Sequence, residues 1–238
     1  MQEIVDMHAH ILPGVDDGAR TMEESLEVLL EASRQHITQV IVTPHFHPGR
    51  YMVTASEIYR QTDALQEACL KRGIPIQLHL GQECYFYSGL TEQLQRGNVL
   101  TLAGSRYVLV EFDPDCSYRQ LTQGLKELQS CGYRPVLAHF ERYTCLRDMG
   151  RLREIREQRV LTQMNFDTLS LRGTIFRKNP WRKLVAEGLV DYLGSDCHGT
   201  HFRPLQIGGT AAWLEAEVDP GIVERMLRHN VDNILNNT

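Results

Sequence analysis

Long uncharged apolar runs are missing from this sequence, since no stretch approaches the roughly 18 residues that a membrane-spanning helix needs. The first ten residues, MQEIVDMHAH, lack the basic and apolar regions of a secretory signal. Basic charge is not in excess either, because 30 acidic and 25 basic residues leave a formal net charge of -5. These absences predict a cytoplasmic protein that neither inserts into membranes nor binds nucleic acid.

Cysteine pairs of the C-x-x-C type are also absent, and the six cysteines are scattered along the chain. Without a secretory signal, free thiols are a better interpretation than a disulfide framework. Cys145 and Arg151 do fit the Cys-x5-Arg spacing of thiol-based tyrosine phosphatases. We set this match aside because the intervening LRDMG is helix-like, whereas a phosphate-binding loop needs exposed backbone N–H groups.

The overall composition is that of a globular protein. Hydrophobic residues make up 42% and charged residues 23% of the 238 positions, which excludes disorder, collagen-like sequence and a coiled coil. The length suits one large domain or two smaller ones. Because no linker or low-complexity run divides the chain, we expect a single domain over residues 1–238.

Short apolar runs alternate with amphipathic ones along the chain. The apolar runs predict seven strands, at 3–8, 39–43, 76–81, 107–111, 135–138, 160–165 and 190–194. Helical patterns lie between them, at 118–130, 146–158 and 181–187, with a last one beginning at Asp219-Pro220. This alternation predicts an α/β fold with a parallel sheet. Seven units favour a closed or nearly closed barrel over two doubly wound halves, although the sequence leaves closure open.

Two further helices have recognisable ends. Thr21 with Glu24, and Thr54 with Glu57, have the spacing of capping boxes. Gly73 follows Lys71-Arg72 and is typical of a helix C-terminus.

Histidines and carboxylates follow six of the seven predicted strands. They are His8, His10, Asp17, His45, Glu83, Glu111, His139, Asp196 and His198. The carboxyl ends of the strands of a parallel barrel share one rim, where functional sites assemble. A lone histidine is usually structural, but histidines and carboxylates at the ends of six strands on one rim predict a common site.

Charge indicates what such a site would hold. Four carboxylates in one pocket repel one another unless protons or cations neutralise them. Imidazoles are common partners of carboxylates around divalent metals, and nine ligands are too many for one ion. We therefore expect two or three metal ions. Nitrogen and oxygen ligands without thiolate favour manganese, iron or zinc over calcium, and these residues alone do not separate manganese from zinc.

These residues lie in motifs of a known family. MHAHILPGVDDGARTMEESLEVL, TPHFHPGRY, GQE, VEF, AHFERY and GSDCHGTHFRP resemble the PHP (polymerase and histidinol phosphatase) superfamily, and within it the capsule-type bacterial tyrosine phosphatases of the CpsB/CapC group. The resemblance implies a distorted seven-stranded, TIM-like (β/α)7 barrel with a trinuclear metal cluster at the C-terminal rim, most often of manganese.

The resemblance also implies roles for single residues. His8, His10, Glu83 and Asp196 would hold one metal, Glu83, Glu111 and His139 a second, and Asp17, His45 and His198 the third. His47, two residues after His45, could exchange roles with it. Arg142 in ERY and Arg203 in FRP would bind the substrate phosphate as the catalytic arginines.

The implied activity is hydrolysis of phosphotyrosine by a metal-activated hydroxide. The expected substrate is a phosphotyrosine-bearing protein tail, that of a bacterial tyrosine autokinase in capsule or exopolysaccharide biosynthesis. Two alternatives stay open: a PHP phosphatase of a small phosphomonoester such as histidinol phosphate or a nucleotide, and a metal-bound barrel without phosphatase activity. The oligomeric state is not indicated.

Overall fold

The computed structural model describes residues 3–170 and 179–237. Its strands are β1 (Ile4–Ala9), β2 (Ile37–Val42), β3 (His45–His47), β4 (Tyr51–Met52), β5 (Gln77–His79), β6 (Glu83–Tyr85), β7 (Tyr107–Glu111), β8 (Arg134–Leu137), β9 (Leu161–Asn165) and β10 (Tyr192–Gly194). Its α-helices are α1 (Met22–Arg34), α2 (Ala55–Arg72), α3 (Leu90–Gln95), α4 (Tyr118–Ser130), α5 (Met149–Glu157), α6 (Pro180–Ala186), α7 (Gly208–Glu217), α8 (Pro220–Glu224) and α9 (Asn230–Leu235).

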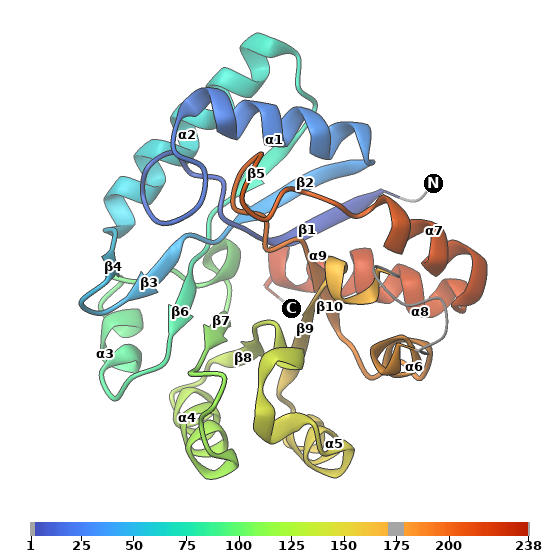
Figure 1. The fold of residues 1–238 in the computed structure, drawn as a ribbon. Coiled ribbons are helices and arrows are strands. Elements are labelled where there is room, and N and C mark those ends of the chain that lie inside the picture. Colours follow the sequence, from blue (N-terminus) through green and yellow to red (C-terminus); the bar gives the residue numbers. More distant parts are fainter. Residues whose placement is uncertain (1–2, 171–178, 238) are drawn as a thin grey trace.

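The strands form two sheets. The smaller has the order β1-β2-β5 and the larger the order β10-β9-β8-β7-β6-β3-β4, and every pairing is parallel except the β3–β4 hairpin. Backbone hydrogen bonds join the ends of β1 and β10, from Asp196 N to His8 O at 2.8 Å and from His10 N to Cys197 O at 2.9 Å. The strands therefore curl around a common centre, and the larger helices lie outside them (Figure 1).

This architecture confirms the predicted α/β fold in its coarser form, a curled and largely parallel sheet with helices outside. It is not one continuous seven-stranded ladder, because the strands divide into two sheets, and the second and third predicted strands are each followed by a short strand that was not predicted. β2 is followed by β3 after Thr43-Pro44, and β5 by β6 after residues 80–82. Strands of three residues show no hydrophobic periodicity, which is why β3 and β6 were not predicted.

Two hydrophobic cores hold the elements in place. The larger packs the strands against the helices and includes Cys84 and Cys197. The smaller joins residues of β1, β2, β7, β8 and β10 to Val231 and Ile234 of α9. These buried cores fix the strand ends that carry the functional residues. No helix in the described ranges combines the length and apolar character needed to cross a membrane.

The helix ends follow the local sequence closely. Thr54 Oγ1 accepts a hydrogen bond from Glu57 N at 3.2 Å, and Gly73 ends α2 with a φ of 67°. Helix α5 begins at Met149, later than predicted, because the side chain of Asp148 caps it. The box predicted at Thr21 and Glu24 is half formed: Thr21 caps α1, but the Glu24 carboxylate accepts from Arg20 N and Thr200 N instead.

Candidate metal centre

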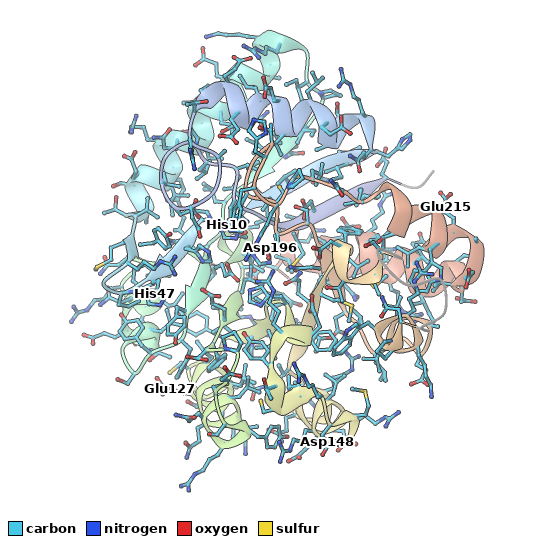
Figure 2. The ribbon with its side chains drawn as sticks, in the orientation of Figure 1. His10, His47, Glu127, Asp148, Asp196 and Glu215 are labelled. Atoms are coloured by element: carbon cyan, nitrogen blue, oxygen red, sulfur yellow. The ribbon has the colours of Figure 1, made fainter. Side chains whose placement is uncertain are left out.

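The nine predicted ligand side chains lie together where the strands end. Figure 2 shows His10 and Asp196 near the middle of the molecule, where β1 and β10 meet. Register explains one of the contacts, because His45 and Glu83 are partners in the β3–β6 ladder and so project from the same face. Their side chains approach to 3.0 Å, from His45 Nδ1 to Glu83 Oε2.

Glu83 is the fully buried centre of this cluster. Its Oε1 lies 2.7 Å from His139 Nε2. Its Oε2 lies 3.3 Å from His8 Nε2, 3.2 Å from His10 Nε2 and 3.0 Å from His45 Nδ1. Burial opposes ionisation of this carboxyl, but the surrounding imidazoles hold the pKa of Glu83 well below its usual 4.5. Glu83 is therefore an ionised carboxylate that can face more than one cation.

Hydrogen bonds on the far side of the histidine rings fix which nitrogen is free. His8 Nδ1 lies 3.1 Å from Gln163 Oε1, and His10 Nδ1 lies 2.9 Å from Asp16 Oδ2. An oxygen acceptor beside Nδ1 keeps the proton there, so that each neutral ring presents the lone pair of its Nε2. The two Nε2 atoms face each other at 3.1 Å, an arrangement that repels unless a cation lies against both.

His198 has the same design. Its Nδ1 lies 2.9 Å from the carbonyl oxygen of Asp196, and its buried Nε2 has no hydrogen-bond partner among the described residues. An acceptor behind each ring and a free nitrogen in front are typical of metal-ligating histidines. The residues present therefore fit divalent cations.

The pKa values show how strongly this cluster attracts positive charge. Burial and the neighbouring His45 disfavour protonation of His10, yet its hydrogen bonds to Asp16 and Glu83 raise its pKa to about 9. Burial likewise opposes the charged form of His45, but Glu83 and Glu111 raise the pKa of His45 to about 12. By contrast, burial and the charge of His10 lower the pKa of His198 to about 4. The carboxylates thus favour positive charge at the rings of His10 and His45, and bound divalent cations would supply that charge.

Three groups within the cluster have ligand atoms that all lie within 4.8 Å of one another. They are His8 with His10 and Asp196, then His45 with Glu83 and Glu111, and His10 with Asp17, His45 and His198. The first and third resemble two of the predicted ligand sets. The second differs, because His45 rather than His139 accompanies the two glutamates. His139 Nε2 nevertheless lies 2.7 Å from Glu83 Oε1 and 3.7 Å from Glu111 Oε2.

Of the two neighbouring histidines, the structure brings His45 and not His47 into this cluster. The His47 ring packs against Tyr85 at 4.2 Å between centroids, and its Nδ1 lies 3.1 Å from Pro48 O. Figure 2 shows His47 farther from the centre than His10 and Asp196. The two side chains share one face of β3, but only His45 reaches the carboxylates.

The two predicted arginines converge on one carboxylate. Asp196 Oδ2 lies 2.5 Å from Arg142 Nη2, 2.8 Å from Asn165 Nδ2 and 3.4 Å from Arg203 Nη1. The other oxygen, Oδ1, lies 3.6 Å from His8 Nε2, 3.5 Å from His10 Nε2 and 3.6 Å from His198 Nδ1. Asp196 thus has one oxygen occupied by three donors and one oxygen directed at the histidines.

Two cavities open beside the cluster. One of about 130 Å³ is lined by Arg142, Arg203, Asn165 and Ser195 among others. The other, of about 670 Å³, reaches His198 and continues along the start of α1. A substrate therefore has access to both guanidiniums from the smaller cavity.

Sequence reasoning missed three residues that support the cluster. Asp16, which precedes the predicted ligand Asp17, is a buried carboxylate that accepts from His10 Nδ1 and His45 N. Although burial opposes its ionisation, the hydrogen bond from His10 lowers the pKa of Asp16 to about 2. Gln163 and Asn165 of β9 are buried amides whose contacts are formed across the sheet, and a single polar residue in a strand gives no signal for that.

The thiol of Cys145 has no place in this site. It is buried in a 3-10 turn, and burial raises its pKa, which disfavours the thiolate. Arg151 donates to the backbone carbonyl of Cys145 at 3.2 Å and lies over the Tyr118 ring. The Cys-x5-Arg spacing therefore does not form an anion-binding loop here.

Accordingly, Cys145→Ser is expected to leave kcat/KM for an aryl phosphate within about twofold of wild type, because the thiol touches no residue of the cluster. Steady-state kinetics on folded, metal-loaded protein would check this. A collapse of turnover with metal still bound would instead indicate a thiol-based reaction.

The fold and the site together define a class, an α/β protein with a buried histidine–carboxylate cluster suited to more than one divalent cation. The sequence profile of capsular polysaccharide synthesis proteins, CpsB/CapC, matches residues 4–236. The chain therefore belongs to the CpsB/CapC family.

Individual relatives support this assignment. Tyrosine-protein phosphatase YwqE of Bacillus subtilis is 31% identical over 236 residues, which cover 98% of this chain and 92% of YwqE. Tyrosine-protein phosphatase CpsB of Streptococcus agalactiae is 30% identical over 208 residues, 84% of this chain and 85% of CpsB.

Solved structures agree. A structure from work on YwqE of B. subtilis and CpsB of Streptococcus pneumoniae, described as metal-dependent tyrosine phosphatases, superposes with a TM-score of 0.88 at 30% identity, covering 99% of this chain and 95% of that one. An amidohydrolase from Mycoplasma synoviae, at 13% identity and a TM-score of 0.60 over 98% of this chain and 87% of its own, shares the fold alone.

Proposed function

We propose that this protein is a metal-dependent protein-tyrosine phosphatase whose metal ligands are the nine residues of the cluster. The observation that carries the proposal is Asp196, which connects the buried histidines through one oxygen to two guanidiniums through the other. Membership of a family whose relatives are named tyrosine phosphatases supports the same activity. Nothing in these relatives favours the alternative of a small-metabolite phosphatase.

Two or three divalent ions, manganese foremost, would be held by the nine ligands. His8, His10 and Asp196 would surround one of them, with Glu83 shared between this ion and a second one. The geometry leaves His45 beside Glu83 and also beside Asp17, so that it could serve either neighbouring ion. Ions bound there would supply Lewis-acid charge and an activated water for attack on phosphorus.

The chain's own residues would bind and orient the phosphate. Arg142 and Arg203 are part exposed and lie at the wall of the smaller cavity. Each guanidinium can offer further N–H groups to phosphoryl oxygens while it stays anchored on Asp196. Because charge stays on those oxygens during transfer, two fixed guanidiniums stabilise the transition state.

Aryl phosphates are the favoured substrate class. A phenol has a pKa of about 10, so phenolate leaves without strong general-acid help. The cluster consists of carboxylates and imidazoles that we assign as metal ligands. A separate general acid is not needed for a phenolate leaving group. Phosphoserine, whose alkoxide is a much poorer leaving group, should be the slower substrate.

The wider setting follows from the family and the composition. We propose a phosphotyrosine-bearing tail of a bacterial tyrosine autokinase as substrate, in capsule or exopolysaccharide biosynthesis. A cytoplasmic location suits the free cysteines, which stay reduced there. We further propose that residues 1–238 form one domain, and that its two sheets together form a distorted (β/α)7 barrel of the PHP type.

A turnover comparison tests the proposed function. Manganese-loaded protein is expected to hydrolyse phosphotyrosine peptides faster than phosphoserine peptides and histidinol phosphate, and more than one metal ion per chain should be found by elemental analysis. Chelation should remove the activity and added manganese should restore it. Phosphotyrosine ranking last, or activity from protein with at most one ion, would contradict the proposal.

A further inference from the structure

Strand β9 is the one predicted strand that contributes none of the nine predicted ligands, yet it lies between β10 and β8 in the larger sheet, beside the cluster. Its residues Gln163 and Asn165 are both buried, at 0% and 2% exposure. They alternate along the strand and so project from the same face. Buried amides need hydrogen-bond partners, so the partners of these two show what they do beside the cluster.

The two amides form a continuous chain of hydrogen bonds across the site. Asn165 Nδ2 lies 2.8 Å from Asp196 Oδ2, and Gln163 Nε2 lies 2.9 Å from Asn165 Oδ1. Gln163 Oε1 then lies 3.1 Å from His8 Nδ1 and 2.7 Å from the backbone N of His139. The chain connects side chains or backbone of three predicted ligands.

The direction of this chain is fixed at both ends. An ionised Asp196 can only accept, so Asn165 must donate through Nδ2 and turn its oxygen to Gln163. At the other end the backbone N–H of His139 can only donate, so Gln163 must present its oxygen there. Both ends require the same amide orientations. The oxygen of Gln163 consequently keeps a proton on His8 Nδ1 and leaves the His8 Nε2 lone pair toward the cluster.

Space for the chain is provided by the neighbouring strand. Gly194 of β10 is the register partner of Asn165. A Cβ at Gly194 would lie 2.6 Å from His8 Cβ and 3.0 Å from Gln163 Nε2. A side chain at this position would displace both the ligand and the amide behind it, so glycine is required for the close approach.

From these contacts we infer that Gln163 and Asn165 are positioning residues of the metal centre, which impose the His8 tautomer and hold Asp196 with its Oδ1 toward the ions. A primary amide carries a donor and an acceptor on separate atoms without charge, so it can pass one bond direction from a carboxylate to an imidazole. This inference rests on the proposed metal centre, and it concerns two residues that are not among the nine predicted ligands.

Binding of Mn2+ alone to metal-free protein, followed by titration calorimetry, tests the inference. Gln163→Met keeps the size of the side chain but removes the acceptor, and it should weaken Mn2+ binding by about 10- to 100-fold, as losses behind metal-ligating histidines do. Gln163→Glu retains the acceptor for His8 and His139 but loses the donor to Asn165, so its loss of Mn2+ affinity should be clearly smaller than that of Gln163→Met. Asn165→Leu removes the donor to Asp196 and should also weaken binding, with a larger effect on KM than on kcat through the tethered arginines.

A matched control separates positioning from stability. Gln66 is an amide with the same two-sided bonding, from Nε2 to Ile76 O at 3.0 Å and from Leu78 N to Oε1 at 2.7 Å, but it lies on α2 and bonds to the start of β5, away from the cluster. Gln66→Met should lower the melting temperature of metal-free protein while leaving the Mn2+ affinity unchanged.

The outcomes are distinguishable. Wild-type protein that binds no Mn2+ would overturn the metal centre and the inference together. Wild-type binding with unchanged affinity in Gln163→Met, or equal losses in Gln163→Met and Gln163→Glu, would overturn the inference alone. If Gln163→Met does not fold, unchanged Mn2+ affinity in folded Asn165→Leu would overturn it.

Discussion

Glu83→Ala is expected to lose bound metal and to lower kcat/KM by at least about 10³-fold, or ~4 kcal/mol of transition-state stabilisation. The reason is geometric, because both oxygens of this buried carboxylate face imidazole nitrogens within 3.3 Å. In the proposed centre two ions would share this carboxylate, so its removal would leave neither ion with a complete ligand set. His198→Ala should be milder, since that ring offers only one free nitrogen.

Elemental analysis and kinetics on the same preparations would check this expectation. Asp191→Ala is a suitable control, because Asp191 is a carboxylate bonded to Arg156 and Thr162 before β10, at the opposite end of the strands from the cluster. It should lower stability without lowering metal content. Glu83→Ala protein that kept both its metal and near wild-type turnover would refute the shared-ligand role.

Arg142→Lys and Arg203→Lys are each expected to lower kcat/KM by about 10- to 1000-fold, roughly 1.5–4 kcal/mol, without loss of metal. A guanidinium has five N–H donors in a planar fork, so it can hold Asp196 and a phosphoryl oxygen at the same time. Lysine is a point charge on a flexible stem and cannot do both in a fixed geometry. Arg142 should show the larger effect, because its bond to Asp196 Oδ2 is 2.5 Å against 3.4 Å for Arg203.

The chain offers a closely matched control for the arginine variants. Arg156 Nη1 lies 2.5 Å from Asp191 Oδ2, the same separation as in the Arg142–Asp196 pair, but away from the cluster. Arg156→Lys should leave kcat/KM unchanged. Indifference of the enzyme to substitution at both Arg142 and Arg203, in metal-loaded protein, would mean that the metals alone hold the phosphate.

Local sequence signals were sufficient for much of the fold. Tyr107–Glu111 and Tyr118–Ser130 have the predicted bounds, because an apolar run and an amphipathic run are each decided by residues near in sequence. Thr54 and Gly73 mark the ends of α2 as expected, since capping is also a local interaction. The curling of the strands around one centre was not decided in this way, because it depends on contacts between β1 and β10 from opposite ends of the chain.

For the candidate site, the sequence by itself determined which acids and histidines follow the strands, and parallel topology then required them to meet. Only the tertiary structure decided which of these side chains contact one another. The three-residue strands β3 and β6 pair His45 with Glu83 and leave His47 against Tyr85. Gln163 shows the physical reason most clearly: its amide carries no charge or periodicity that marks a role, and the role inferred for it depends on two donors, His8 Nδ1 and His139 N, which other parts of the chain bring to its oxygen.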